Sequence, residues 1–131
     1  PPRFAEQVHA LVGGADVVLD LVGGAYLPES IEALASRGRV ILVGLLAGAK
    51  AEVPLGKLLR LRASVTGTVL RARPLEEKIA LTQDFTRRAL PLFSRRALRP
   101  VIDAVHPMDR LPEALERMRR SEALGKQVLR W

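Results

Sequence analysis

The stretch Asp16-Val-Val-Leu-Asp-Leu-Val-Gly-Gly24 decides the class of fold. It is a short, almost continuous apolar run rich in β-branched residues, and it ends in two glycines. Such a run is typical of a strand that is covered on both faces, as the strands of parallel sheets are. A second run of the same kind, Arg39 to Gly44, also ends in glycine. The two runs therefore predict two buried strands of a parallel sheet.

The segment between these runs shows helical spacing. Leu27, Ile31, Leu34 and Ala35 fall on one helical face, and Gly38 lies just past the expected end of the helix. A strand–helix–strand order with crossovers of about 10–15 residues predicts an open, doubly wound α/β sheet. We expect right-handed connections and helices on both faces of that sheet.

The remainder of the chain continues the alternation of helices and strands. The segment Ser64–Leu70 is more polar than the first two runs, so we expect it at the edge of the sheet. A long helix begins near Leu75, and Pro91 is expected to kink or fray its end. The other expected elements are a helix over Phe4–Val12, a short helix from Pro54 to about Leu61, a strand over Pro100–Val105, a helix aligning Leu111, Leu115 and Met118, and a strand over Gln127–Trp131.

Composition excludes several kinds of site. The 131 residues include no cysteine and two histidines, His9 and His106. Disulfides, cysteine-based metal sites and a cysteine nucleophile are therefore excluded, and we expect no metal. No apolar run approaches the roughly 20 residues that a membrane span needs, and no signal peptide opens the chain. The sequence thus predicts a cytoplasmic globular protein without a membrane segment.

The charge balance raises nucleic acid as a partner. Lysine and arginine number 21 against 14 aspartates and glutamates, and residues 71–131 carry 14 of the basic and 8 of the acidic side chains. Aromatic residues are only 4% of the chain, so a stacking platform is missing, and no motif that reads DNA or RNA is present. We therefore expect no nucleic-acid partner, with a basic nucleic-acid-binding module as an alternative.

Glycines mark the ends of the expected strands. In open α/β sheets, ligands bind outside the carboxyl ends of the strands. Gly24 and Gly44 follow the first two strands and Gly67 lies in the third, where a missing side chain lets the backbone approach a flat or phosphorylated ligand. The alternative is that they are turn glycines, which any α/β protein needs. Asp20 is expected to cap the turn after its strand rather than to orient a ligand.

Several segments together carry a resemblance to a known family. These segments are Asp16–Gly24, Gly38-Arg-Val-Ile-Leu-Val-Gly44, Gly67-Thr-Val-Leu-Arg-Ala-Arg73, Glu76-Glu-Lys78, Leu98-Arg-Pro-Val-Ile102, Glu113-Ala and Gly125-Lys-Gln-Val-Leu129. They resemble the zinc-independent NAD(P)H:quinone oxidoreductases of the medium-chain dehydrogenase/reductase superfamily, and in particular the p53-inducible quinone oxidoreductase-like subgroup. The resemblance departs at Val69, where that subgroup usually has threonine.

The resemblance implies a particular place in a longer enzyme. Members of the family are more than twice this length, and they bind the cofactor pyrophosphate through a glycine-rich turn that these 131 residues do not contain. Residues 1–97 then correspond to the C-terminal half of a Rossmann doubly wound parallel sheet. Residues 98–131 correspond to a strand–helix–strand return segment that would complete a GroES-like catalytic domain. We expect the isolated chain to be inactive.

The resemblance also implies the chemistry. The intact enzyme would transfer a hydride from NADPH or NADH to a quinone or a conjugated carbonyl acceptor, without a catalytic side chain from this segment. An enoyl-thioester reductase of the same superfamily is an alternative. A homodimer through Ser64–Leu70 is expected as well. The cofactor-binding residues that the resemblance implies are Gly24, Ile41, Leu42, Val43, Gly44, Thr66, Gly67 and Thr68.

Overall fold

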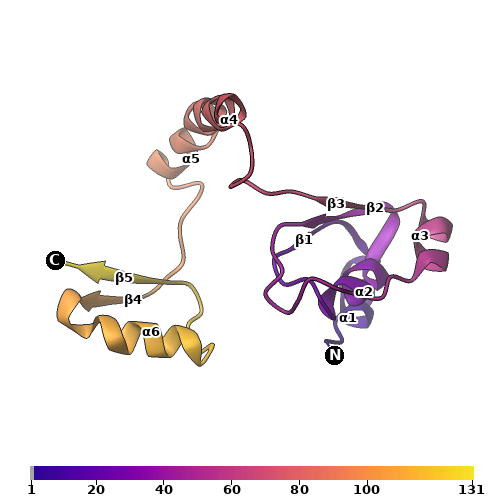
Figure 1. Ribbon diagram of the computed structural model, residues 1–131, viewed down its shortest axis with the longest axis horizontal. Helices are drawn as coiled ribbons and strands as arrows, with labels where there is room; N and C mark the ends of the chain where they lie inside the picture. The colour runs from indigo at the N-terminus through magenta and orange to yellow at the C-terminus, as the bar shows by residue number, and fades with distance from the viewer. Residues whose placement is uncertain (1) are drawn as a thin grey trace. The chain divides into compact units, whose positions relative to one another are not determined.

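A computed structural model describes residues 2–131, and its contacts divide the chain into two compact units. The first unit ends at Arg73 and the second is Pro74–Trp131 (Figure 1). Each unit contains parallel strands joined through helices, so the predicted α/β class is confirmed. The sequence predicts a boundary between residues 97 and 98, where the nucleotide-binding half ends and the return segment begins. This boundary differs from the division into compact units, and it stays a prediction.

The first unit is built on a three-stranded sheet. Its strands are β1 (Ala15–Asp20), β2 (Leu34–Leu42) and β3 (Ser64–Gly67), in the order β1-β2-β3 and all parallel. Asp20 pairs with Leu42, and Leu42 pairs with Gly67, so the carboxyl ends of the three strands lie level. The predicted edge position of β3 is confirmed, although the strand ends at Gly67 and not at Leu70.

Helices α1 (Ala5–Val12), α2 (Tyr26–Glu32) and α3 (Leu55–Leu61) complete this unit. The core cluster consists of Leu27 and Ile31 from α2 and of Leu34 and Val40 from β2. The expectation that Leu34 lies in the helix is wrong, because α2 ends at Glu32 and Leu34 begins β2, paired with Ala15. Apolar spacing places Leu34 in the core in either element, so it does not separate the two assignments.

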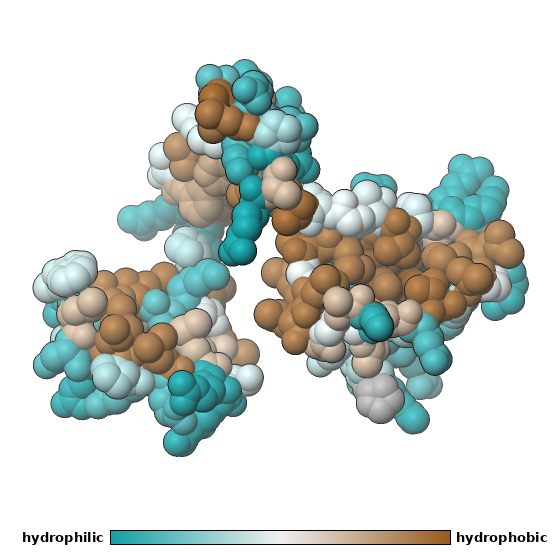
Figure 2. Space-filling view, viewed as in Figure 1, coloured by the Kyte–Doolittle hydropathy of each residue, from teal (hydrophilic) through white to brown (hydrophobic). Residues whose placement is uncertain are grey.

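The expectation that helices cover both faces of the sheet is not met by α2 and α3. The core cluster joins α2 and α3 to Val18 and Val40, so both helices lie on the same face of the sheet. On β1, Val17 and Leu19 alternate with Val18 and are 43% and 65% exposed. Figure 2 shows apolar surface gathered over this unit. The apolar run of β1 therefore gives this strand two apolar faces, and α2 and α3 pack against one of them.

The second unit contains a helix pair and a strand–helix–strand segment. Helix α4 (Leu75–Arg88) ends just before α5 (Leu90–Ser94), whose first turn holds Pro91, as the predicted break requires. Strand β4 (Ile102–Pro107) leads through the 3-10 helix η1 (Met108–Arg110) and α6 (Leu111–Arg119) to β5 (Lys126–Arg130). Strands β4 and β5 are parallel, so the predicted order of this segment is confirmed. Within residues 2–131, every helix is too short or too polar to cross a membrane.

Candidate functional site

A pocket of about 360 Å³ opens at the carboxyl ends of β2 and β3. Apart from the Thr68 hydroxyl, its side chains are apolar. Polar groups in such a lining come mainly from the backbone, which suits a flat ligand that carries few charges. The lining residues are Leu42, Val43, Gly44, Leu45, Gly67, Thr68 and Val69.

The structure gathers most of the predicted site residues around this pocket. Five of the eight line it, while Ile41, Thr66 and Gly24 do not. Ile41 and Thr66 are cross-strand partners within the sheet, one residue before the lining pair Leu42 and Gly67. Their proposed role in cofactor binding stays a prediction, as it does for the whole set.

The three strand-end glycines differ in what surrounds them. A Cβ atom at Gly44 would lie 2.5 Å from the carbonyl oxygen of Leu21, and one at Gly24 would collide with the backbone of Ala47. Packing between the two loops therefore already requires glycine at both positions. A Cβ atom at Gly67 would meet no other atom within 4 Å. Among these three positions, only Gly67 has open space beside it that a ligand could occupy.

Two lining residues, Leu45 and Val69, were missed as site residues. Each directly follows a predicted position in the loop after its strand, so the signal was adjacency to Gly44 and Thr68. Arg73 lies outside the lining and forms hydrogen bonds with the loop after β3. Its guanidinium donates to the Thr68 hydroxyl and to the Val69 carbonyl, at 3.2 Å each. The position of the Thr68 side chain is therefore set in part by Arg73.

Asp20 caps the turn after β1, as expected from the sequence. Its Oδ1 accepts hydrogen bonds from the backbone N–H groups of Val22 and Gly23, both at 2.8 Å. The residue is only 4% exposed. The turn that it caps packs against the loop that lines the pocket, because the carbonyl of Val22 accepts the N–H of Ala47 at 2.7 Å.

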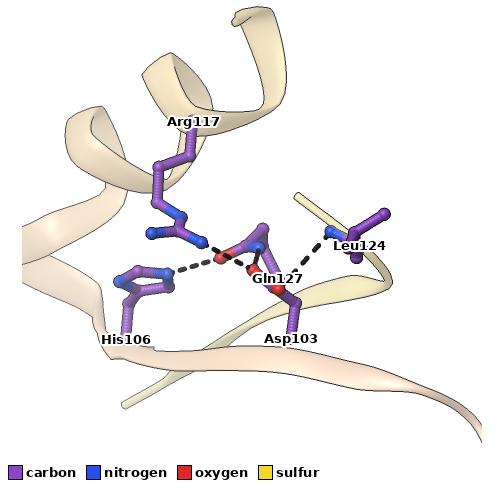
Figure 3. Close-up of polar contacts among 5 residues, drawn as sticks. All are labelled: Asp103, His106, Arg117, Leu124 and Gln127. Carbon is purple, nitrogen blue, oxygen red and sulfur yellow. Dashed lines mark hydrogen bonds and ion pairs between the residues drawn. The ribbon is translucent and has the colours of Figure 1, made fainter. Parts of the chain in front are cut away.

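A second polar cluster lies in the C-terminal unit, between β4, β5 and α6 (Figure 3). The Asp103 carboxylate accepts hydrogen bonds from the Gln127 amide, the Arg117 guanidinium and the Leu124 N–H. The hydrogen bond from Gln127, followed by the hydrogen bond and charge of Arg117, lowers the pKa of Asp103. Gln127 Oε1 lies 2.6 Å from His106 Nε2, which is then the protonated nitrogen.

The described residues offer no ligand set for a metal ion. Among residues 2–131, no group of three or more histidine, cysteine, aspartate or glutamate side chains could hold one. His9 contacts the carbonyls of Gly13 and Glu32, and His106 contacts Gln127. The described residues therefore do not fit a zinc ion.

Comparison with known proteins extends over nearly the whole chain. The protein family described as "Zinc-binding dehydrogenase" matches residues 2–129. Quinone oxidoreductase-like protein 2 of Bos taurus is 29% identical over 126 residues, which are 95% of this chain and 36% of that protein. The human synaptic vesicle membrane protein VAT-1 homolog is 26% identical over 88% of this chain and 33% of its own length. The chain thus spans about a third of the curated relatives that it matches.

Solved structures agree with this match. The quinone oxidoreductase from Thermus thermophilus, solved also in complex with NADPH, is 32% identical with a TM-score of 0.74. The match covers 96% of this chain and 40% of that one. A putative alcohol dehydrogenase from Sinorhizobium meliloti 1021 is 33% identical with a TM-score of 0.69, over 99% of this chain and 36% of its own. The fold corresponds to the C-terminal, nucleotide-binding half of such dehydrogenases.

Proposed function

Because this chain belongs to the zinc-binding dehydrogenase family, we propose that the pocket at the ends of β2 and β3 receives the nicotinamide half of NADPH or NADH. The protein of which these residues form the nicotinamide side then reduces a quinone or a similar conjugated carbonyl compound. The observation that carries this proposal is the position of the pocket. It lies beyond the carboxyl ends of parallel strands, which is where open α/β sheets bind their ligands.

The lining suits this role in two respects. The open space beside Gly67 lets a flat ring approach the backbone, whose N–H and C=O groups can orient a carboxamide. Val43, Leu45 and Val69 present apolar surface that excludes water from the ring. The bound cofactor would supply the hydride, and these residues supply orientation and a dry surface.

The remaining parts of the proposal concern the longer enzyme. Residues 98–131 would return to a GroES-like catalytic domain and complete it, and the glycine-rich turn that holds the pyrophosphate would come from outside these 131 residues. The quinone acceptor is supported by the names of the relatives in cattle and in Thermus thermophilus. Because the matches cover about a third of those proteins, the activity of the whole protein belongs to the proposal. The family match favours an oxidoreductase over a nucleic-acid-binding module.

Titration of the 131-residue chain tests the proposal. We expect calorimetry to give a dissociation constant for NADPH weaker than about 10 μM, and we expect no oxidation of NADPH by a quinone. The reason is that each charge-assisted hydrogen bond to the pyrophosphate is worth roughly 1.5–3 kcal/mol, and the turn that supplies these bonds is absent from the sequence.

Nuclear magnetic resonance locates the weak binding that remains. Millimolar reduced nicotinamide mononucleotide should shift the amide signals of Val43, Gly44 and Gly67–Val69, while adenosine 2′,5′-bisphosphate should leave them in place. Shifts from the adenine compound alone would contradict the nicotinamide assignment. Binding of NADPH tighter than about 10 μM would contradict the expectation that the pyrophosphate site lies elsewhere.

A further inference from the structure

We propose that Asp20 positions one wall of the pocket through the backbone of the turn that follows β1, without touching the ligand. The wall is residues 43–47, which follow β2 and include the lining residues Val43, Gly44 and Leu45. We call it the β2 wall. The inference rests on the proposed function only for the identity of the ligand.

The side-chain carboxylate of Asp20 is hydrogen-bonded to the turn that follows β1. Oδ1 accepts two N–H groups, from Val22 and Gly23, at 2.8 Å each. Within this turn, Gly23 and Gly24 have φ angles of +64° and +51°, which glycine adopts without strain. Two consecutive residues of this kind have many accessible conformations, so the two hydrogen bonds to the carboxylate contribute to selecting this one.

The turn in its place contacts the β2 wall. The carbonyl of Val22 accepts the N–H of Ala47, and the carbonyl of Asp20 itself accepts the N–H of Val43, at 2.7 Å each. The side chain of Leu45 rests on Gly23, since a Cβ atom there would lie 2.8 Å from its Cδ2. The β2 wall therefore contacts the end of β1 through Val43, and it contacts the turn through Leu45 and Ala47.

The two oxygens of the Asp20 carboxylate differ in their surroundings. Oδ2 is buried and has no hydrogen-bond partner among the residues that the structure describes. A buried carboxylate oxygen without a donor is costly, so the turn gains only from Oδ1. An asparagine would keep that acceptor, whereas an alanine would remove it. The two substitutions therefore separate positioning from any role of the negative charge.

Amide hydrogen exchange on the 131-residue chain tests this role. In Asp20→Ala, the amides of Val22 and Gly23 lose their acceptor directly. Positioning predicts that the amide of Ala47, whose acceptor is the Val22 carbonyl in the turn, also exchanges about tenfold faster or more. Asp20→Asn should restore slow exchange at all three amides.

Two controls separate this effect from a general loss of stability. The amide of Ala15, which bonds to Ala33 at the other end of the sheet, should keep its exchange rate. Ser30→Ala removes a polar group that is also buried, 3% exposed, but lies in α2 outside the turn. It should leave the ratio between the β2 wall amides and the Ala15 amide unchanged.

The opposite results would overturn the proposal. Faster exchange at Val22 and Gly23 alone would show that the β2 wall does not depend on Asp20, and so would an Asp20→Asn chain that behaves like Asp20→Ala. If Asp20→Ala does not fold, exchange of the wild-type chain against denaturant decides the matter. The amides of Val22, Gly23 and Ala47 should then open together, and separate openings would contradict positioning.

Addition of millimolar reduced nicotinamide mononucleotide distinguishes this inference from the proposed function. If the amides of the turn and of Ala47 respond together to Asp20→Ala, but no amide signal shifts with this compound, the positioning role is supported and the nicotinamide assignment is wrong. If these amides respond separately, the positioning role is wrong whether or not the compound binds.

Discussion

Residues of one type serve different purposes at the pocket. Gly44 is required by packing, since a Cβ atom would lie 2.5 Å from the carbonyl oxygen of Leu21, whereas Gly67 has open space on the side where its Cβ would be. The sequence shows only that both residues stand at the carboxyl ends of strands. The difference between a glycine that packs and a glycine that leaves room arises from what the neighbouring loop places beside it.

Alanine substitutions should separate these two glycines. Gly44→Ala should lower the free energy of unfolding by about 1–3 kcal/mol, because the methyl group forces the two loops apart. Gly67→Ala should leave stability unchanged or raise it by up to about 1 kcal/mol, because alanine fits there and restricts the unfolded chain. Urea unfolding of both variants beside the wild type measures the difference.

The Gly67→Ala variant also tests ligand binding. Gly67→Ala should weaken the binding of reduced nicotinamide mononucleotide despite its normal stability, since the methyl group occupies open space at a residue that lines the pocket. If the two variants lose equal stability, or if Gly67→Ala binds as the wild type does, Gly67 is a turn residue like Gly44.

At the scale of elements, β3 is the exposed edge of the first unit. All four of its residues are exposed, and it has one neighbour, β2. The N–H of Thr68 donates to Leu42. Because amides alternate in direction along a strand, the N–H groups of Val65 and Gly67 point away from β2. These outward groups could pair with β3 of a second copy, which is the homodimer that we propose.

Proline substitutions should distinguish the two sides of β3. Val65→Pro removes an outward N–H and should abolish self-association while the β2–β3 pair remains. Thr68→Pro is the matched control, because it removes the N–H that bonds to Leu42 and should loosen the β2–β3 pair itself. Sedimentation velocity at high micromolar concentration measures the association, and a monomeric wild-type chain would contradict the dimer.

The segment formed by β4, α6 and β5 should lose stability in acid. The hydrogen bonds from Gln127 and Arg117 lower the pKa of Asp103 from its ordinary value of 3.8. A carboxylate whose pKa is lower in the folded state stabilises that state above the ordinary pKa, and this contribution disappears as the pH falls through the folded pKa. The loss therefore lies below about pH 4.

Asp103→Asn should remove this part of the pH dependence. The protection factors of the amides in β4 and β5, which compare each exchange rate with its intrinsic rate, should fall in the wild type between neutral pH and about pH 3 and should fall less in the variant. A wild type and a variant with the same pH profile would show that the contacts of Asp103 do not stabilise the segment.

For the whole molecule, the buried core is small compared with the apolar surface that remains exposed. Among the described residues, three large side chains, Ile31, Leu34 and Val40, are less than 2% exposed. Leu19 and many other large apolar residues are more than one-third exposed. Since free energy from burial scales with the apolar area removed from water, most of the stability of the first unit rests on the α2–β2 contact.

Two truncations should show this difference in unfolding experiments. Ile31→Ala, at a fully buried position, should lower the free energy of unfolding by about 2–5 kcal/mol and can unfold the first unit outright. Leu19→Ala, at a position 65% exposed, should change it by no more than about 0.5 kcal/mol. Equal effects of the two substitutions would show that the face of the sheet carrying Leu19 is covered in solution.

The sequence by itself determined the class and order of the elements. Apolar runs of strand length, helical spacing between them, and the breaks at Pro91 and at strand-end glycines are local properties of the chain. They predicted the parallel strands, the edge position of β3 and the strand–helix–strand segment near the C-terminus, all of which the structure contains. The strand-end glycines predicted a ligand-binding edge at Gly24, Gly44 and Gly67, and the family resemblance added Thr68. Of these four residues, Gly44, Gly67 and Thr68 line the pocket.

Only the tertiary structure decided the details of that site. That Leu34 belongs to β2, that both helices lie on one face, and that Leu45 and Val69 line the pocket depend on which loops meet. The same holds for Gly44, Gly67 and Asp20, whose roles follow from atoms contributed by residues on other segments. Contacts between distant segments leave no periodicity in the sequence, because packing constrains volumes and distances in space rather than spacing along the chain.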